Sequence, residues 1–245
     1  MRNIKITIEY DGSRYKGFSR PAGREAHGTI AGKLTDVLEK MTGESLIELN
    51  CGCRTEPGVH AYGQVANFKT ESDMKVQDIK HYLNRYLPMD IAITEVKEVP
   101  ERFHAQMNAT SIAYVYRMTI TDVPSVFDRK HTYHCFKVPD KKAMRQAALR
   151  LMGSHDFKNF SDSRTSKSTV RNIYAIDIYG DDEELQIMIH ADHFLHNMAR
   201  IIVGTLLDVG FGMRREDDID AIFAGRKSAS PACDPKGLYL QEITY

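Results

Sequence analysis

The first half of the chain alternates between strand-like and helix-like spacing of its hydrophobic residues. Apolar and polar positions alternate from Ile4 to Ile8, which is typical of a half-buried strand. Apolar residues within 31–41 then recur on one helical face, and Thr29 and Gly43 are suited to cap the start and the end of that helix. Further predicted elements in this half are a strand at 61–68, a helix at 76–87 ended by Pro88, and a strand at 91–99.

The second half repeats this succession of strands and helices. Alternation predicts a strand at 112–120 with Tyr114 and Tyr116 on one face, and residues 132–138 can pair with it. The remaining predicted elements are a helix at 141–152, a hairpin of 173–179 and 185–191 around Gly180, helices at 194–209 and 217–224, and a strand at 238–244.

Two such successions predict an α+β fold of the α/β-sandwich kind with two lobes. Each lobe is expected to hold an antiparallel sheet with helices on one face, as a ferredoxin-like or RRM-like pseudo-repeat. A length of 245 residues suits one large domain or two small ones, and we place the lobes at 1–107 and 108–245. No glycine- or proline-rich linker lies near 100–110, so the lobes are expected to pack together.

Composition excludes several classes of protein. Hydrophobic residues make up 42% and charged residues 27%, as in ordinary globular chains, and 4 cysteines do not form a secreted disulfide framework. No apolar run reaches the roughly 18 residues of a membrane span. Because the N-terminal segment has the pattern of a strand rather than of a signal peptide, we expect a cytoplasmic protein.

Charge is neutral in sum but unevenly distributed. The 33 Lys and Arg residues balance 33 Asp and Glu residues, which by itself argues against a nucleic-acid-binding protein. Between Lys141 and Arg171, however, eight basic residues accompany two acidic ones. A second basic segment contains Arg14, Lys16, Arg20 and Arg24, with Tyr15 and Phe18 among them. Such segregated charge either presents a basic face to phosphate groups or is a solvated surface.

The octapeptide Arg54–Ala61 is the densest candidate for chemistry. A charged, turn-forming sequence between two apolar segments suits a catalytic loop, in which Arg54 keeps the carboxylate of Glu56 ionised and Gly58 allows a positive φ. The same residues also suit a surface turn with a solvent-screened ion pair. Both interpretations stay open on the residues alone.

Metal and cofactor sites find little support in the sequence. Cys51 and Cys53 with His60 lack the second pair of ligands typical of zinc sites. His193 and His196, three residues apart by the predicted apolar helix, are more typical of capping or hydrogen bonding than of metal ligation. Neither a glycine-rich phosphate-binding motif nor a G-x-S-x-G nucleophile elbow is present. We therefore expect no metal, no nucleotide cofactor and no other cofactor.

Taken together, these segments resemble the tRNA pseudouridine synthase A (TruA-type) family over nearly the whole chain. Residues 9–12 with Tyr15 and Gly17 are similar to the family's opening EYDG-x₂-Y-x-G, and residues 54–65 are similar to its RTDAGVHA-x-GQV. The other matching motifs follow in the family's order, at 29–34, 83–91, 103–105, 114–116, 155–160, 170–171 and 194–204.

The resemblance implies two α/β lobes with antiparallel sheets, an active-site cleft between them, a homodimer, and no metal or cofactor. It implies an isomerase that converts uridine to pseudouridine in the tRNA anticodon stem-loop, at positions 38, 39 and 40. The family's catalytic carboxylate corresponds to Glu56, beside Arg54, which organises the flipped nucleotide. Tyr114 corresponds to the base-stacking tyrosine and Arg200 to the arginine that ion-pairs with the carboxylate.

The expected partner is therefore tRNA, with no membrane involved. Substrate binding is predicted for residues of the matching motifs and basic segments, namely Tyr10, Arg14, Thr55, Gly58, His60, Phe103, His104, Lys158 and Arg171.

Several positions depart from the family pattern. The family's catalytic residue is aspartate followed by alanine, where this chain has Glu56 and Pro57, and Gln106 and Ile112 stand where basic residues are usual. The extra methylene of glutamate moves the carboxylate by about an ångström, a shift that can cost about 10²-fold in rate. Two hypotheses follow. Either Pro57 resets the loop so that Glu56 still reaches its target, or the chain is a catalytically impaired RNA-binding paralogue.

Overall fold

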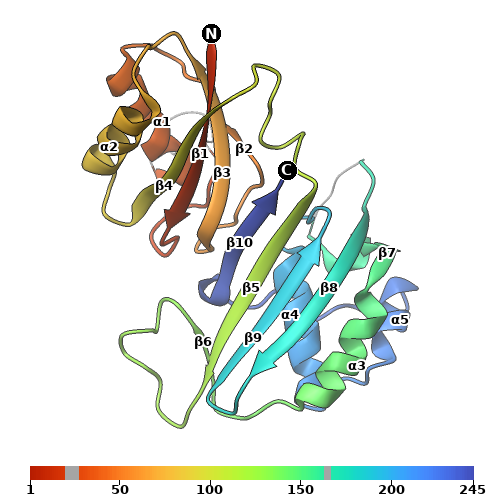
Figure 1. Ribbon diagram of the computed structural model, residues 1–245. Coiled ribbons are helices and arrows are strands. Elements are labelled where there is room, and N and C mark those ends of the chain that lie inside the picture. The colour runs from red at the N-terminus through yellow and green to blue at the C-terminus, as the bar shows by residue number, and fades with distance from the viewer. Residues whose placement is uncertain (20–27, 163–166) are drawn as a thin grey trace. The chain divides into compact units, whose positions relative to one another are not determined.

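The computed structural model describes residues 1–19, 28–162 and 167–245 (Figure 1). The chain is a mixed α+β protein that divides into two compact units. Unit 1 comprises residues 1–110 with 240–245, and unit 2 comprises residues 111–239. The sequence interpretation placed all of 108–245 in the second lobe, whereas the last six residues belong to unit 1. Within the described residues, no helix is long and apolar enough to cross a membrane.

Unit 1 is built on strands that pair antiparallel with β1 (Arg2–Tyr10) on both of its sides. Its strand order is β4 (Ile91–Val99), β1, β3 (His60–Thr70) and β10 (Leu238–Thr244), and the short β2 (Asn50–Cys51) also pairs with β3. The end of the chain lies close to β3, because a Cβ atom at Gly63 would come within 2.5 Å of the Gln241 carbonyl oxygen. This packing accounts for the place of residues 240–245 in unit 1.

Two helices accompany this sheet and begin and end where local signals predict. Helix α1 (Ile30–Thr42) is capped by Thr29, whose hydroxyl accepts from the Gly32 N–H at 3.1 Å. It ends at Gly43, which has a left-handed φ of 73°. Helix α2 (Val76–Tyr86) packs against α1 and β4 (Figure 1). The predicted alternation in β1 is confirmed, because its three isoleucines, Ile4, Ile6 and Ile8, are fully buried.

Unit 2 holds its own set of paired strands together with helices. Antiparallel pairings give the strand order β5 (Ser111–Ile120), β9 (Glu184–Ala191), β8 (Val170–Gly180) and β7 (Gly153–Asp156). The described helices are α3 (Lys141–Leu151), α4 (Met198–Gly210) and α5 (Asp218–Phe223), with short 3₁₀ helices η2 (Phe157–Phe160) and η3 (Pro235–Gly237). Helix α3 packs on β8, α4 and α5 (Figure 1).

Unit 2 differs from the sequence interpretation at two places. Strand β6 (Tyr133–Cys135) pairs with β5 in parallel, so this sheet is not wholly antiparallel. Helix α4 begins at Met198, four residues later than predicted, because Asn197 adopts a left-handed φ of 59°. His196, which the predicted helix 194–209 included, therefore precedes α4, as His193 does. The apolar Phe194 and Leu195 extend the helical pattern into a segment that is not helical.

A buried amide pair ties the sheet of unit 1 to the segment after β4. The Asn67 side chain donates to Asn3 Oδ1 at 2.9 Å and accepts from the Ala105 N–H at 2.8 Å. Asn3 in turn donates to the carbonyl oxygens of Phe103, at 2.8 Å, and Pro100, at 3.1 Å. Both asparagines are at most 2% exposed, so water cannot replace these bonds if one partner is removed.

Asn67→Ala is expected to lower the free energy of unfolding by about 2–4 kcal/mol, because it strands the Ala105 N–H and Asn3 Oδ1 without partners inside the protein. The matched control is Asn84→Ala, which also breaks two side-chain bonds, both to Ile93, but at an exposed residue where water can take over. Asn84→Ala should lower the free energy of unfolding by only about 1 kcal/mol. Urea unfolding measures both, and equal losses would contradict the importance of burial.

Candidate active site

The loop between β2 and β3 carries the predicted catalytic carboxylate. Thr55 and Val59 are buried, at 4% and 1% exposure, whereas Arg54 is exposed and Glu56 half-buried. The loop therefore anchors two small side chains inward and leaves its guanidinium and carboxylate accessible to a ligand.

Glu56 begins a tight turn that its successors make rigid. The Val59 N–H donates to the Glu56 carbonyl oxygen at 3.2 Å, and Gly58 between them has a φ of 81°. Proline at the second position and glycine with positive φ at the third are the features of a type II turn. Pro57 fixes its own φ and so stiffens the turn that carries the carboxylate.

Polar side chains of β1 and β3 hold the loop from its buried side. The Tyr10 hydroxyl lies 2.7 Å from Thr55 Oγ1, and the Gln64 amide donates to the Cys53 carbonyl oxygen at 3.0 Å. Tyr10 is 4% exposed and Gln64 fully buried. Burial raises the pKa of Tyr10 far above its ordinary value, so the hydroxyl stays neutral and available for hydrogen bonding.

The segment after β1 holds the loop from a second side through its backbone. The Phe18 N–H donates to the Thr55 carbonyl oxygen at 3.1 Å, and the Gly58 N–H donates to the Tyr15 carbonyl oxygen at 3.4 Å. Two glycines make this approach possible. A Cβ atom would lie 2.0 Å from the Val59 carbonyl oxygen at Gly12 and 2.6 Å from that of Thr55 at Gly17.

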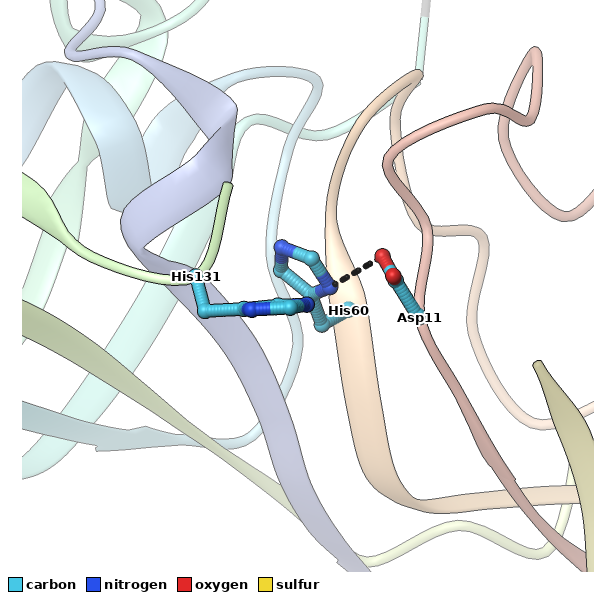
Figure 2. A group of neighbouring side chains, drawn as sticks. All are labelled: Asp11, His60 and His131. Atoms are coloured by element: carbon cyan, nitrogen blue, oxygen red, sulfur yellow. Dashed lines mark ion pairs between the residues drawn. The ribbon is translucent and has the colours of Figure 1, made fainter. Parts of the chain in front are cut away.

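His60 fastens the end of the loop to the end of β1. The imidazole is 1% exposed, and its Nδ1 lies 3.1 Å from the Gly12 N–H and 3.2 Å from Asp11 Oδ1 (Figure 2). When Nδ1 carries no proton, its lone pair accepts a hydrogen bond from the Gly12 N–H. When Nδ1 is protonated, it donates to the Asp11 carboxylate. In either state it joins β3 to the residues that follow β1.

The predicted phosphate contact Arg14 is occupied by an acid of its own unit. Its guanidinium forms an ion pair with Asp90, which raises the pKa of Arg14 further, and the Tyr15 hydroxyl donates to the same carboxylate at 2.6 Å. Burial raises the pKa of Tyr15 to about 12, so this hydroxyl remains a donor. Two other members of the basic segment, Arg20 and Arg24, lie outside the described residues.

Phe103 and His104 occupy a different part of unit 1. They line a cavity of about 480 Å³ to which no described residue of the loop 53–59 contributes. The Phe103 ring packs on the Tyr245 ring at 5.1 Å between centroids. His104 Nδ1 accepts from the Gln106 N–H at 3.2 Å and closes a turn. The structure does not bring these two residues into the loop.

The remaining predicted residues belong to unit 2. Tyr114, on β5, is 4% exposed and packs edge-on against Phe194 with ring centroids 5.0 Å apart. Arg200, on α4, donates from Nε to the Cys233 carbonyl oxygen at 2.6 Å and from the guanidinium nitrogen Nη1 to Asn197 Oδ1 at 2.8 Å. Both side chains are therefore held by their own unit.

The two basic residues predicted to bind substrate in unit 2 differ in environment. Lys158 is exposed, with Nζ 3.6 Å from an Asp156 carboxylate oxygen. Arg171 donates to the Val170 and Ser168 carbonyl oxygens at 2.6 and 3.0 Å, while its buried Nε has no hydrogen-bond partner within the described parts of the chain. Residues 163–166 of the basic stretch 141–171 lie outside the described residues.

Sequence reasoning missed the residues that hold the others in place. Gln64, Asp11 and Asp90 support the loop and its surroundings, and Asn197 holds Arg200. The signal that could have found Asp11, Gln64 and Asp90 was their place within the matching motifs at 9–12, 54–65 and 83–91.

Comparison with known proteins gives consistent matches over the full chain. A family model described as tRNA pseudouridine synthase matches residues 6–108 and 147–245. The chain is 39% identical to "tRNA pseudouridine synthase A 2" of Bacillus anthracis and 40% identical to "tRNA pseudouridine synthase A" of Bacillus sp. (strain KSM-64), with 100% of each chain covered. A solved structure titled "Crystal Structure of a Cbf5-Nop10-Gar1 Complex" has a TM-score of 0.38 at 10% identity, over 97% of this chain and 48% of that one. A TM-score below 0.5 does not establish that the two structures share a fold.

Gly17→Ala is expected to loosen the loop 53–60, because the added methyl group meets a backbone carbonyl that cannot move without the turn. Amide hydrogen exchange in 54–60 should become at least about tenfold faster, since local opening requires less free energy. Gly43→Ala is the matched control. Its φ of 73° is equally unfavourable for alanine, but nothing lies within 4 Å of the new Cβ. An equal rise of loop exchange in both variants would show that the contact with Thr55 does not hold the loop.

Proposed function

The chain belongs to the tRNA pseudouridine synthase family and is an isomerase that forms pseudouridine in tRNA, and we propose that Glu56 supplies its catalytic carboxylate. One observation carries the proposal. Glu56 is the single acid in the loop 53–60, and it sits half-buried at the head of a turn that is held from two sides. A carboxylate kept in one place is what a reaction at a single ribose carbon requires.

The reaction exchanges one bond for another at that carbon. The glycosidic bond from N1 to C1′ breaks, the uracil turns, and C5 bonds to C1′; the proton that C5 loses is matched by one that N1 gains. A carboxylate can assist as a nucleophile at C1′ or as a base that removes a ribose proton. Both roles need Glu56 ionised and within reach of the sugar.

The family resemblance supports the other roles in this proposal. The uridine must leave the base stack to be reached, which needs a pocket with an aromatic side chain for the base. We assign base stacking to Tyr114, organisation of the flipped nucleotide to Arg54, and the role of cationic partner of the carboxylate to Arg200. Arg54 is suited to contact a phosphate because it is exposed beside Glu56 in the sequence.

The rigid turn favours an active enzyme over an impaired paralogue. The family's aspartate is here replaced by a longer acid, and the residue that follows is Pro57. Because Pro57 and Gly58 together define the direction of the turn, the backbone from which the longer side chain projects is fixed. The substitutions at 56 and 57 are thus compatible with one co-adapted change.

The uridines that the enzyme modifies are proposed to be those of the anticodon stem-loop, at positions 38, 39 and 40, and the enzyme to act in the cytoplasm as a homodimer. These assignments rest on the family resemblance. The protein, incubated with tRNA and followed by position-resolved nucleoside analysis, should yield pseudouridine within the anticodon stem-loop and not elsewhere. Light scattering that shows a monomer of 27.9 kDa would contradict the dimer.

Variants of Glu56 test the carboxylate directly. Glu56→Ala and Glu56→Gln should abolish pseudouridine formation while the Kd for tRNA changes less than twofold, because one carboxylate adds nothing to phosphate binding. Glu56→Asp should be slower by on the order of 10²-fold, since the reacting oxygen is withdrawn by about an ångström. Glu9→Gln, an exposed acid on β1, is the control and should retain full activity.

The opposite result in this series would identify an RNA-binding relative. If the natural protein is inactive and the double change Glu56→Asp with Pro57→Ala creates activity, the loop is degenerate rather than co-adapted.

Binding of tRNA is expected to weaken steeply with added salt, because Lys and Arg side chains displace counterions from phosphates. Lys158→Gln and Arg171→Gln should each reduce the steepness of log K for tRNA binding against log salt concentration by about 0.9. Lys227→Gln is the control in the same unit. Its Nζ lies 2.5 Å from Asp218 Oδ1, so the slope should not change. The proposed phosphate contacts would be contradicted if tRNA affinity did not depend on salt, or if all three variants changed the slope equally.

A further inference from the structure

The guanidinium of Arg200 is fixed at two of its nitrogens by groups of its own unit. Nε donates to the Cys233 carbonyl oxygen at 2.6 Å, and a terminal nitrogen donates to Asn197 Oδ1 at 2.8 Å. Two bonds to a planar group define both its place and the direction of its plane. The N–H groups that these two bonds do not use can then be aimed at a ligand.

Asn197 is unusual in its backbone conformation and in the use of its side chain. It precedes α4 with φ 59° and ψ 4°, a left-handed conformation that glycine and, less often, asparagine and aspartate adopt. Asparagine at this position ordinarily accepts a hydrogen bond from the first turn of the helix, but no such side-chain capping bond forms here within the described residues. Its amide oxygen accepts from the Arg200 side chain instead.

The other end of the Asn197 amide is anchored in turn. Nδ2 donates to Asp162 Oδ2 at 2.7 Å. The Asp162 N–H donates to the His196 carbonyl oxygen at 3.2 Å, and the Ser161 hydroxyl donates to the same oxygen at 3.0 Å. Asp162 is thus attached to the turn that it supports, and a continuous chain of hydrogen bonds runs from its carboxylate through the Asn197 amide to the guanidinium.

We propose that Asn197, anchored by Asp162, is a positioning residue that holds the Arg200 guanidinium in its catalytic orientation. This inference rests on the proposed function, in which Arg200 acts in catalysis. Glycine would adopt the same backbone conformation without strain but would make neither side-chain bond. Asparagine at a left-handed position therefore combines two requirements, a sharp turn into α4 and a side chain that joins Asp162 to Arg200.

Asn197→Gly separates the side chain from the backbone, because glycine tolerates this conformation. The single-turnover rate of pseudouridine formation should fall about 10- to 100-fold through misplacement of the guanidinium. The Kd for tRNA should change less than twofold and the midpoint of thermal unfolding only slightly. Leu46→Gly is the matched control, since Leu46 is the other non-glycine residue with a left-handed φ among those that the structure describes, at 62°, and is exposed. It should leave rate, Kd and midpoint unchanged.

An exchange of the two anchored side chains supplies a rescue. Asn197→Asp alone places a second carboxylate beside Asp162 and should lower the rate by repulsion. Asn197→Asp with Asp162→Asn restores an amide donor opposite a carboxylate and keeps an acceptor for Arg200. The double variant should therefore form pseudouridine at least about tenfold faster than Asn197→Asp alone. Failure of the double variant to exceed the single one would overturn the proposed chain.

Arg200→Ala separates the role of Asn197 from the role of Arg200 itself. If it loses activity while Asn197→Gly stays within twofold of the natural protein, Arg200 is catalytic but Asn197 does not position it. If Asn197→Gly loses rate and tRNA affinity or stability together, its role is structural and the inference fails. If Arg200→Ala is fully active, the assignment of Arg200 fails together with this inference. An inactive natural protein overturns the proposed function itself.

Discussion

The attachment of the loop 53–60 to the end of β1 is the constraint on which the candidate site depends. The Tyr10–Thr55 hydroxyl contact lies beneath the loop, and backbone bonds from Tyr15 and Phe18 hold its side. Gly12 and Gly17 matter because any larger residue would push the loop away from β1. A loop on a surface is ordinarily the most mobile part of a protein. Here Thr55 and Val59 are buried against the rest of the unit, while the side chains of Arg54 and Glu56 remain accessible.

Rigidity of this kind suits the proposed reaction. A carboxylate that acts at one carbon of a flipped nucleotide loses much of its effect when displaced by about an ångström. The turn built from Pro57 and Gly58 supplies a fixed base for the longer side chain of Glu56. Unit 2 follows the same principle with Arg200, whose guanidinium is held at two nitrogens. In both units, the polar residue proposed to act in catalysis is supported by neighbours without a proposed catalytic role.

Charge in this protein is largely compensated where it lies. Arg14 is paired with Asp90, Arg150 with Asp220 and Lys227 with Asp218, which agrees with the equal totals of basic and acidic residues. Exposed pairs of this kind add little stability, but they reduce the number of cations available to phosphates. Attraction to tRNA must then come from fewer residues than the basic segments suggest when read as sequence. A role for Arg14 at a phosphate would use the guanidinium N–H groups that Asp90 does not engage.

Elements whose signals are local were determined by the sequence itself. The bounds of α1 follow from Thr29 and Gly43, and the predicted strands at 91–99 and 238–244 coincide with β4 and β10, because caps and alternation act over a few residues. The motifs around Glu56 likewise identified the loop. Only the tertiary structure decided that β6 runs parallel to β5, that Asp90 neutralises Arg14, that Asn197 turns left-handed, and that residues 240–245 join unit 1. Each of these depends on a partner, in most cases dozens of residues away, and a distant partner leaves no period or cap in the local sequence.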